Sequence, residues 1–389
     1  MYSLTLKKNE EKLIIAGRCW VYANEVNTID GSGKNGDLAF VYSASGLFLG
    51  KGFINHLSKI LVRIISKDRD EVIDDAFFEK RIATANNLRL DLGFENNYRV
   101  VFAEADNLPA LIVDKYNDIL VAQFLSLGMD LRKDAIVKAL IKLFSPRGIF
   151  ERSDVSVREK EGLQFVKGKL YGDFDTKVDI VENGIKMTVD VENGQKTGYF
   201  LDQKQNRLAL RRYSANKDVL DCFSNSGGFA LNCAIGGAKS VTALDISQLA
   251  IDNIAHNASA NNLNISTVCA DVFDKLREYK KDGKSFDTII LDPPAFCKSV
   301  AEVKDAYRGY KDINILALKL LRKGGYLATC SCSHYMTMSL FESMLADAAK
   351  ESHRQVRYLE RRAQSQDHPS IVGNDESLYL KFYILNAMD

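Results

Sequence analysis

The sequence predicts an α/β protein in which a doubly wound parallel sheet follows a small β-rich domain and an α+β middle domain. From about residue 218, apolar strand-like runs alternate with helical stretches of ten or more residues, which is typical of a parallel sheet. Before that point, short strand-like runs are separated by turn signals. A chain of 389 residues with 46% hydrophobic content is long enough for two or three domains.

Residues 1–72 are expected to form the β-rich domain. Turn signals, GSGKNG at 31–36 and SASG at 43–46, separate short strand-like runs. The stretch KILVRIIS at 59–66 is expected to form an alternating strand.

Residues 73–177 are expected to form the α+β middle domain. Three strand-like runs, RVVFAE, ALIVDKY and ILVAQFL, follow one another closely. Asp130 is expected to cap a helix in which Ile136, Leu140 and Leu143 share one face.

Residues 178–389 are expected to form the third domain. It begins with a hairpin at 178–191, because Asn183-Gly184 stands between two alternating runs. The strands of the sheet are then expected at DVLDCF, SVTALDI, ISTVCA, FDTIILD and GYLATCS. In such sheets ligands bind beyond the carboxyl ends of the strands.

The composition excludes several classes of protein. With 52 Lys+Arg against 51 Asp+Glu, no global charge attracts nucleic acid, so any such affinity must be local. No run of 18 apolar residues occurs, and the N-terminus does not resemble a secretion signal, so we expect a cytoplasmic protein without membrane contact. The 7 cysteines lack paired metal spacing, so we expect no metal and no disulfide framework; Cys222, Cys233 and Cys269 are expected to be buried apolar residues.

A nucleoside cofactor is expected at the first two strands of the sheet. The first strand runs into a segment that contains Gly227 and Gly228, where the backbone can approach a ligand closely. The second strand ends at Asp245, which can accept hydrogen bonds from ribose hydroxyls. The dinucleotide pattern GxGxxG is absent, which favours S-adenosylmethionine over NAD.

Aspartates close four successive strands of the predicted sheet, at Asp221, Asp245, Asp271 and Asp292. A single aspartate at a strand end is more often the N-cap of the next helix. Four in register, with Pro293-Pro294 after the last, favour a ligand site.

The order VLDCFSNSGGF, VTALDIS, CADVF, ILDPPAF and GGYLATCSCS resembles the class I S-adenosylmethionine-dependent methyltransferases, with their Rossmann-like domain. More narrowly, the chain resembles the ribosomal RNA large-subunit methyltransferase I family, whose members methylate cytosine at C5. ENNYRVVFAEADNLPALIVDKYND is similar to that family's middle domain, and GRCWVY with the glycines near 36 and 50–52 is similar to its PUA domain. The resemblance implies that the segment 195–203 also lines the cofactor pocket. The expected cofactor-binding residues are therefore Thr197, Tyr199, Phe200, Asp202, Asp221, Phe223, Ser224, Ser226, Gly227, Gly228, Asp245, Ile246, Asp271, Val272 and Asp292.

Methylation of cytosine C5 needs a nucleophile, because the ring must first be activated by addition at C6, and a thiolate suits this task. Cys297, Cys330 and Cys332 lie near one edge of the predicted sheet, and spacing alone does not choose between Cys330 and Cys332. The match to the family's Thr-Cys-Ser element favours Cys330 as the catalytic residue, although a free cysteine is commonly a small buried apolar residue. Asp292 is expected to hydrogen-bond the target base and to stabilise developing charge.

Pro293 and Phe296 are expected to contact the extruded base, with core packing of Phe296 as an almost equal alternative. One branch of RNA cytosine methyltransferases carries a second cysteine directly after the proline of this motif, where this chain has Ala295. The base that removes the C5 proton therefore stays unassigned.

RNA contacts are expected from a basic segment at 201–217, through Arg207, Arg211 and Arg212, although a charged helix is usually just a solvated face. The expected partner is RNA, with 23S rRNA implied by the resemblance, and a homodimer is left open. Two alternatives remain. The motif Asp-Pro-Pro-Phe also resembles that of methyltransferases that act on adenine N6 or guanine N2, and a non-catalytic RNA-binding protein could keep the same fold.

Overall fold

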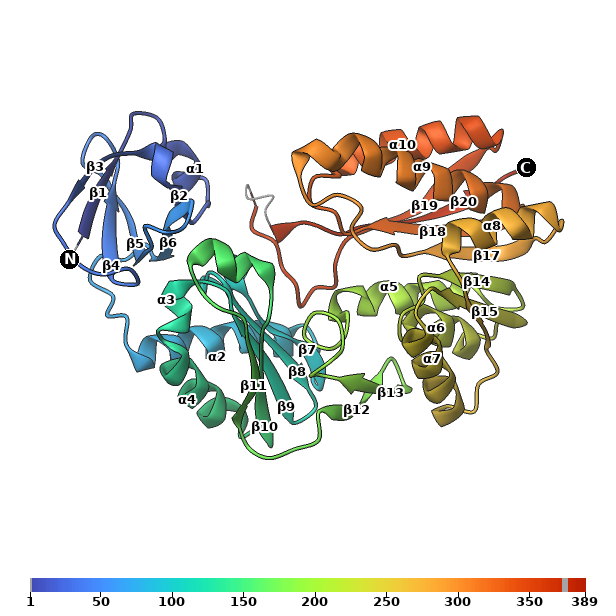
Figure 1. Ribbon diagram of the computed structural model, residues 1–389, viewed down its shortest axis with the longest axis horizontal. Helices are drawn as coiled ribbons and strands as arrows, with labels where there is room; N and C mark the ends of the chain where they lie inside the picture. Colours follow the sequence, from blue (N-terminus) through green and yellow to red (C-terminus); the bar gives the residue numbers. More distant parts are fainter. Residues whose placement is uncertain (1, 373–376) are drawn as a thin grey trace. The chain divides into compact units, whose positions relative to one another are not determined.

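A computed structural model describes residues 2–372 and 377–389 (Figure 1). The chain divides into two compact units. Unit 1 comprises Met1–Ile180, Val189–Leu201 and Gln366–Ser377, and unit 2 comprises Val181–Thr188, Asp202–Ser365 and Leu378–Asp389.

The N-terminal part of unit 1 contains a six-stranded sheet with the order β2-β6-β5-β4-β1-β3. Its elements are β1 (Tyr2–Leu6), α1 (Glu11–Ile15), β2 (Trp20–Tyr22), β3 (Val26–Asp30), β4 (Leu38–Tyr42), β5 (Phe48–Ile54) and β6 (Ile60–Ser66). Alternate residues of β1 and β4, such as Leu4 and Val41, are fully buried. The expectation of short strands between turns is confirmed. The alternation expected along 59–66 is wrong, because β6 is buried at every position from Leu61 to Ser66.

The rest of unit 1 contains a five-stranded sheet with the order β11-β10-β9-β8-β7. Its elements are α2 (Asp75–Asp91), β7 (Asn97–Phe102), β8 (Leu111–Tyr116), β9 (Ile119–Phe124), α3 (Leu127–Asp130), α4 (Lys133–Phe144), β10 (Gly148–Ser153) and β11 (Val166–Tyr171). Helices α2 and α4 lie side by side (Figure 1).

The expected cap of α4 is wrong. Asp130 ends the short helix α3, and the residue that precedes α4 is Arg132. The Asp130 carboxylate instead accepts a hydrogen bond of 2.9 Å from Arg158, a residue that lies 28 positions further along the chain. Of the expected apolar face, Ile136 and Leu140 are fully buried, whereas Leu143 is exposed.

A buried charge joins the N-terminal part of unit 1 to the segment between β10 and β11. Glu161 is 2% exposed and accepts hydrogen bonds from Asn55, Ser58 and Arg63, at 3.1, 2.6 and 2.9 Å. Because a buried carboxylate needs such partners, removal of residues 1–72 would leave this charge without them.

The expected hairpin is confirmed. Strands β12 (Lys177–Glu182) and β13 (Ile185–Asp190) form a two-stranded sheet. Asn183 and Gly184 have φ values of +54° and +78°, the left-handed conformation that a two-residue turn requires at both positions.

Unit 2 is built on a seven-stranded sheet with the order β16-β15-β14-β17-β18-β20-β19. Its strands are β14 (Asp218–Cys222), β15 (Ser240–Asp245), β16 (Ser266–Cys269), β17 (Phe286–Leu291), β18 (Leu321–Ser331), β19 (Val356–Arg362) and β20 (Lys381–Ala387). Its helices are α5 (Lys204–Ala209), α6 (Gly228–Ile235), α7 (Gln248–Ala260), α8 (Val272–Lys281), α9 (Val303–Leu320) and α10 (Met338–Ser352). Figure 1 shows α8, α9 and α10 on one face of the sheet and α5, α6 and α7 on the other.

The five expected strands of this sheet run parallel, which confirms the doubly wound fold. Two further strands that the sequence did not predict complete the sheet, and β20 pairs antiparallel with both β18 and β19. The strand order reverses at β14, which lies between β15 and β17. Ligands bind at such a switch point.

Candidate active site

The segment after β14 is held in an unusual backbone conformation. Phe223 and Asn225 have φ values of +63° and +51°, and Gly227, which precedes α6, has +84°. Non-glycine residues adopt this conformation rarely, and such strain is typical of binding sites. Ser224 anchors the loop, because its hydroxyl donates to the Asp221 carbonyl over 2.7 Å and accepts from the Leu244 amide over 3.1 Å.

Asp221 is fully buried beneath this loop. Its Oδ2 accepts a hydrogen bond of 3.0 Å from the Ala230 amide, whereas Oδ1 has no partner among the described residues. Burial, together with the charges of Asp292 and Asp245, raises the pKa of this carboxyl to about 8. An unpaired buried carboxyl oxygen suits a cationic donor, such as the amino group of S-adenosylmethionine.

Asp245 ends β15 and is half-buried. Its Oδ2 accepts from the Asn225 amide and its Oδ1 from the Ser247 amide, both over 2.9 Å. The neighbouring Ile246 and Leu249 are 69% and 66% exposed, although they are large apolar residues. A carboxylate beside exposed apolar side chains fits the ribose and the base of an adenosine group. Leu249 was not among the residues expected from the sequence.

Asp271 is exposed and caps α8 by accepting from the Asp274 amide over 3.1 Å. The capping alternative therefore holds at this position. Val272 is buried, and Ser226 accepts a hydrogen bond at its carbonyl from Asn257 over 3.1 Å. Cys222 and Cys233 are buried as expected, but the expectation for Cys269 is wrong, because its side chain is exposed.

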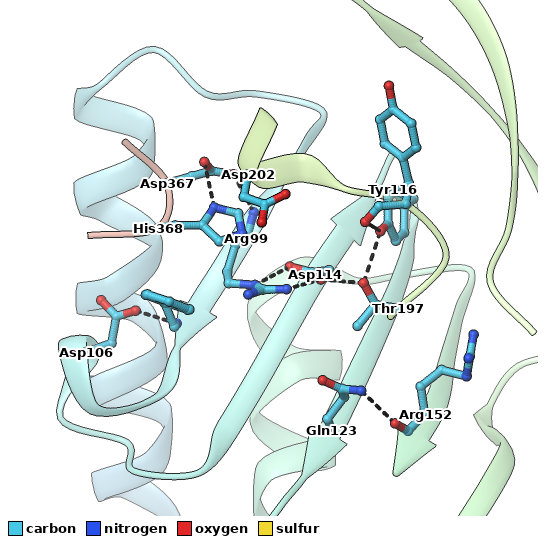
Figure 2. Close-up of polar contacts among 12 residues, drawn as sticks. Arg99, Asp106, Asp114, Tyr116, Gln123, Arg152, Thr197, Asp202, Asp367 and His368 are labelled. Atoms are coloured by element: carbon cyan, nitrogen blue, oxygen red, sulfur yellow. Dashed lines mark hydrogen bonds and ion pairs between the residues drawn. The ribbon is translucent and has the colours of Figure 1, made fainter. Parts of the chain in front are cut away.

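Thr197, Tyr199 and Phe200 belong to unit 1, whereas the other expected cofactor residues belong to unit 2. Figure 2 shows the Asp114 carboxylate between the Arg99 guanidinium and the Thr197 hydroxyl. Thr197 donates to Asp114 over 2.5 Å, and Arg99 donates to it over 2.8 Å. Asp202 is the first residue of the long segment of unit 2, where it accepts a hydrogen bond from the Tyr379 hydroxyl.

The carboxyl ends of β17 and β18 bring Asp292 and Cys330 together. The Cys330 thiol donates to Asp292 Oδ1 over 2.8 Å. Gln203 Nε2 donates to the same carboxylate oxygen over 3.2 Å and to the sulfur over 3.5 Å. Cys330 is fully buried, which raises the pKa of its thiol well above the ordinary 9.0, and the charge of Asp292 raises it further. The resting thiol is therefore protonated, with an acceptor for its proton in contact.

The two other candidate cysteines lie in different surroundings. Cys297 is buried, and its thiol donates to the Ser299 carbonyl over 3.0 Å. Cys332 follows the last residue of β18 and packs against the same apolar cluster as Cys330. The contact of 2.8 Å between the Cys330 thiol and the Asp292 carboxylate favours Cys330 as the reacting thiol.

Pro293 is buried, and Phe296 lies against two other rings. The centroids of Phe296 and Tyr310 are 4.6 Å apart, and those of Phe296 and Phe273 are 6.2 Å apart. These contacts favour the packing alternative for Phe296.

Lys381 of β20 is a buried amine whose charge interacts with Cys330 and Cys332. The sequence analysis did not predict it. Its Nζ donates to the carbonyls of Ser333 and Tyr379, at 2.6 and 2.8 Å. Burial lowers the pKa of its ammonium group to about 8.

The three arginines that were expected to contact RNA differ in exposure. Arg207 is buried and makes two hydrogen bonds with Glu182, at 2.6 and 2.7 Å, which argues against a phosphate contact. Arg211 is half-buried and donates to Asn232 over 3.1 Å. Arg212 has a side chain that is 64% exposed, paired with Glu360. It is therefore the best placed of the three to meet RNA.

Among the described residues, no helix is long and apolar enough to cross a membrane. Within the same residues, no cluster of three or more His, Cys, Asp or Glu side chains could hold a metal ion.

Comparisons with known proteins agree with this geometry. Residues 164–382 match the family model of S-adenosylmethionine-dependent methyltransferases, and residues 4–67 match that of PUA-like domains. The chain is 41% identical over 392 residues to a "Ribosomal RNA large subunit methyltransferase I" from Klebsiella pneumoniae, which covers 99% of this chain and 98% of the relative. A relative of the same name from Shewanella amazonensis is 43% identical, with 97% of each chain covered.

Solved structures share the fold along nearly the whole chain. A candidate SAM-dependent methyltransferase from Streptococcus mutans has a TM-score of 0.84 at 24% identity and covers 99% of this chain and 100% of its own. A candidate methyltransferase in complex with SAH has a TM-score of 0.86 at 23% identity, with the same coverage. On the matched family model and the identity to these relatives, the chain belongs to the S-adenosylmethionine-dependent methyltransferases and, within them, to the ribosomal RNA large subunit methyltransferase I family.

Proposed function

We propose that this protein methylates C5 of a cytosine in large-subunit ribosomal RNA, through a covalent adduct between Cys330 and C6 of the base. The names of the full-length relatives support the RNA substrate. The contact of 2.8 Å between the Cys330 thiol and Asp292 is the observation that carries the C5 chemistry, because methylation of an exocyclic nitrogen needs no thiol.

The pair performs two tasks in this mechanism. As the sulfur bonds to C6, the thiol proton passes to Asp292 Oδ1 and the S–H electron pair stays on sulfur to form the new bond. Asp292 then carries a proton that it can donate to N3 of the ring, where electron density accumulates. The raised pKa of the thiol makes this transfer necessary, since free thiolate is scarce near pH 7.

The residues around β14 and β15 fit S-adenosylmethionine. Asp245, Ile246 and Leu249 would hold the adenosine group, and the unpaired oxygen of Asp221 would face the amino group. The bound cofactor supplies the methyl group that C5 receives.

An RNA that carries 5-fluorocytidine tests the proposal. Fluorine cannot leave as the C5 proton does, so the wild-type protein should form a stable adduct, and mass spectrometry should locate it at Cys330. Cys330→Ala should form none, whereas Cys332→Ala and Cys297→Ala are matched controls that should. An adduct at another cysteine would overturn the assignment. If no adduct forms and a methylated adenine or guanine is found instead, the alternative on an exocyclic nitrogen is right.

We also propose the supporting roles that the sequence predicts. Residues 1–72 would add RNA affinity as a PUA-like domain, residues 73–177 would form the middle domain, and residues 178–389 would carry the chemistry. A cytoplasmic location follows from an RNA substrate of this kind.

A further inference from the structure

Gln203 ends the segment 195–203, which was expected to line the cofactor pocket, and it lies at the reacting pair. It is 2% exposed and precedes α5, and its carboxamide nitrogen reaches both Asp292 and the sulfur of Cys330. Which end of a glutamine amide faces a neighbour follows from its other partners, because nitrogen and oxygen are otherwise interchangeable in shape.

A chain of polar contacts fixes the direction of this amide. Arg362 Nε donates to Asn206 Oδ1 over 2.8 Å, and Asn206 Nδ2 donates to Gln203 Oε1, also over 2.8 Å. A guanidinium group can only donate, so Asn206 must turn its oxygen toward Arg362 and its nitrogen toward Gln203. Gln203 must then use its oxygen on Asn206. Its N–H donors are left for the reacting pair.

We propose that Gln203 is a positioning residue that presents N–H donors to the Cys330 sulfur and to Asp292, and that Asn206 and Arg362 set its direction. This inference rests on the proposed function. A thiolate accepts hydrogen bonds better than a thiol, so the Gln203 donor favours the charged sulfur as the thiol proton moves to Asp292. The second contact holds the carboxylate oxygen within reach of that proton.

The test measures the titration of Cys330 in the full-length protein without RNA. Iodoacetamide alkylates the sulfur and releases iodide, and mass spectrometry of the Cys330 peptide gives the rate at each pH. The midpoint is compared rather than the absolute rate, because the thiol is buried and access limits all variants alike. Asp292, Cys332 and Lys381, the titratable groups that act on this thiol, are unchanged in the variants.

Gln203→Met should raise the midpoint by about one pH unit, a roughly tenfold loss of thiolate, because one hydrogen bond to a charged group is lost. Asn206→Leu should give a shift in the same direction. Leucine resembles asparagine in shape but removes the donor that holds the Gln203 oxygen, so the amide can turn its nitrogen away from the sulfur without any change of charge. Gln355→Met is the matched control on an exposed glutamine and should leave the midpoint unchanged.

Binding of S-adenosylmethionine and thermal unfolding confirm that each variant is folded. If Gln203→Met does not fold, the nearly isosteric Asn206→Leu carries the test. Wild-type midpoints in the folded variants would overturn the positioning role. A shifted midpoint in a protein whose wild type forms no 5-fluorocytidine adduct would keep the role of Gln203 and reject the C5 chemistry.

Discussion

Asp245→Ala is expected to weaken S-adenosylmethionine binding by more than the loss of one ligand contact. In the free protein, the carboxylate accepts two amide hydrogen bonds, from Asn225 and Ser247, both of 2.9 Å. The first of these holds the loop that contains the left-handed Phe223 and Asn225. The substitution therefore removes the ribose acceptor and also frees the loop.

The magnitude follows from these contacts. A hydrogen bond to a charged group contributes roughly 1.5 to 3 kcal/mol, so loss of the ribose contact alone lowers affinity by about tenfold to a hundredfold. Loss of order in the loop adds to this cost. Asp245→Asn separates the two effects, because its one amide oxygen can still accept from Asn225 but cannot serve both partners as the carboxylate does.

Isothermal titration calorimetry of the three proteins measures the affinities directly. The expected order of affinity is wild type, then Asp245→Asn, then Asp245→Ala. An unchanged affinity in Asp245→Ala would show that the cofactor binds elsewhere. Equal losses in the two variants would show that the loop contact contributes nothing.

Two further outcomes are expected. Glu161→Ala breaks a buried pair and should lower the free energy of unfolding by about 3 to 5 kcal/mol. Glu79→Ala breaks the exposed pair with Lys142 and should lower it by about 0 to 1 kcal/mol. Urea denaturation measures both values, and equal losses would refute the argument. Because the pKa of Asp221 is raised from 3.8 to about 8, the folded protein keeps a proton that the unfolded chain loses, so stability should fall as pH rises across this window. Thermal unfolding from pH 4 to 8 should show a flatter profile for Asp221→Asn, and parallel profiles would contradict the shift.

The sequence predicted the parts of the fold that depend on local signals. Asn183 and Gly184 favour a tight turn whatever surrounds them. The five apolar strands of unit 2 are typical of a parallel sheet that is buried on both faces. The prediction that Asp130 caps a helix was wrong, because the side chain of Arg158, distant in the sequence, binds this carboxylate. Local pattern carries no information about such a partner.

The same limit applies to the basic segment at 201–217. Its charges are visible in the sequence, but the acid that neutralises Arg207 is Glu182, which lies 25 positions earlier in the hairpin. The excess of positive charge therefore predicted an exposed RNA-binding residue at Arg207, which instead forms a buried ion pair with Glu182. Only exposure distinguishes Arg212 from Arg207.

The reacting pair shows why some site residues are predictable and others are not. Asp292 directly follows β17 and Cys330 lies at the end of β18, and neighbouring parallel strands end at one edge, so topology alone places them together. Gln203 and Lys381 reach the same edge from a helical turn and from an antiparallel strand, whose positions no sequence period specifies. The roles of Gln203 and Lys381 follow from which of their partners donate hydrogen bonds and which accept them. A donor-only Arg362 determines which atoms Gln203 offers, and two carbonyls hold the Lys381 amine in a buried position. The chemistry at this edge of the sheet thus depends on the residues that orient the hydrogen bonds of Asp292 and Cys330 as much as on Asp292 and Cys330 themselves.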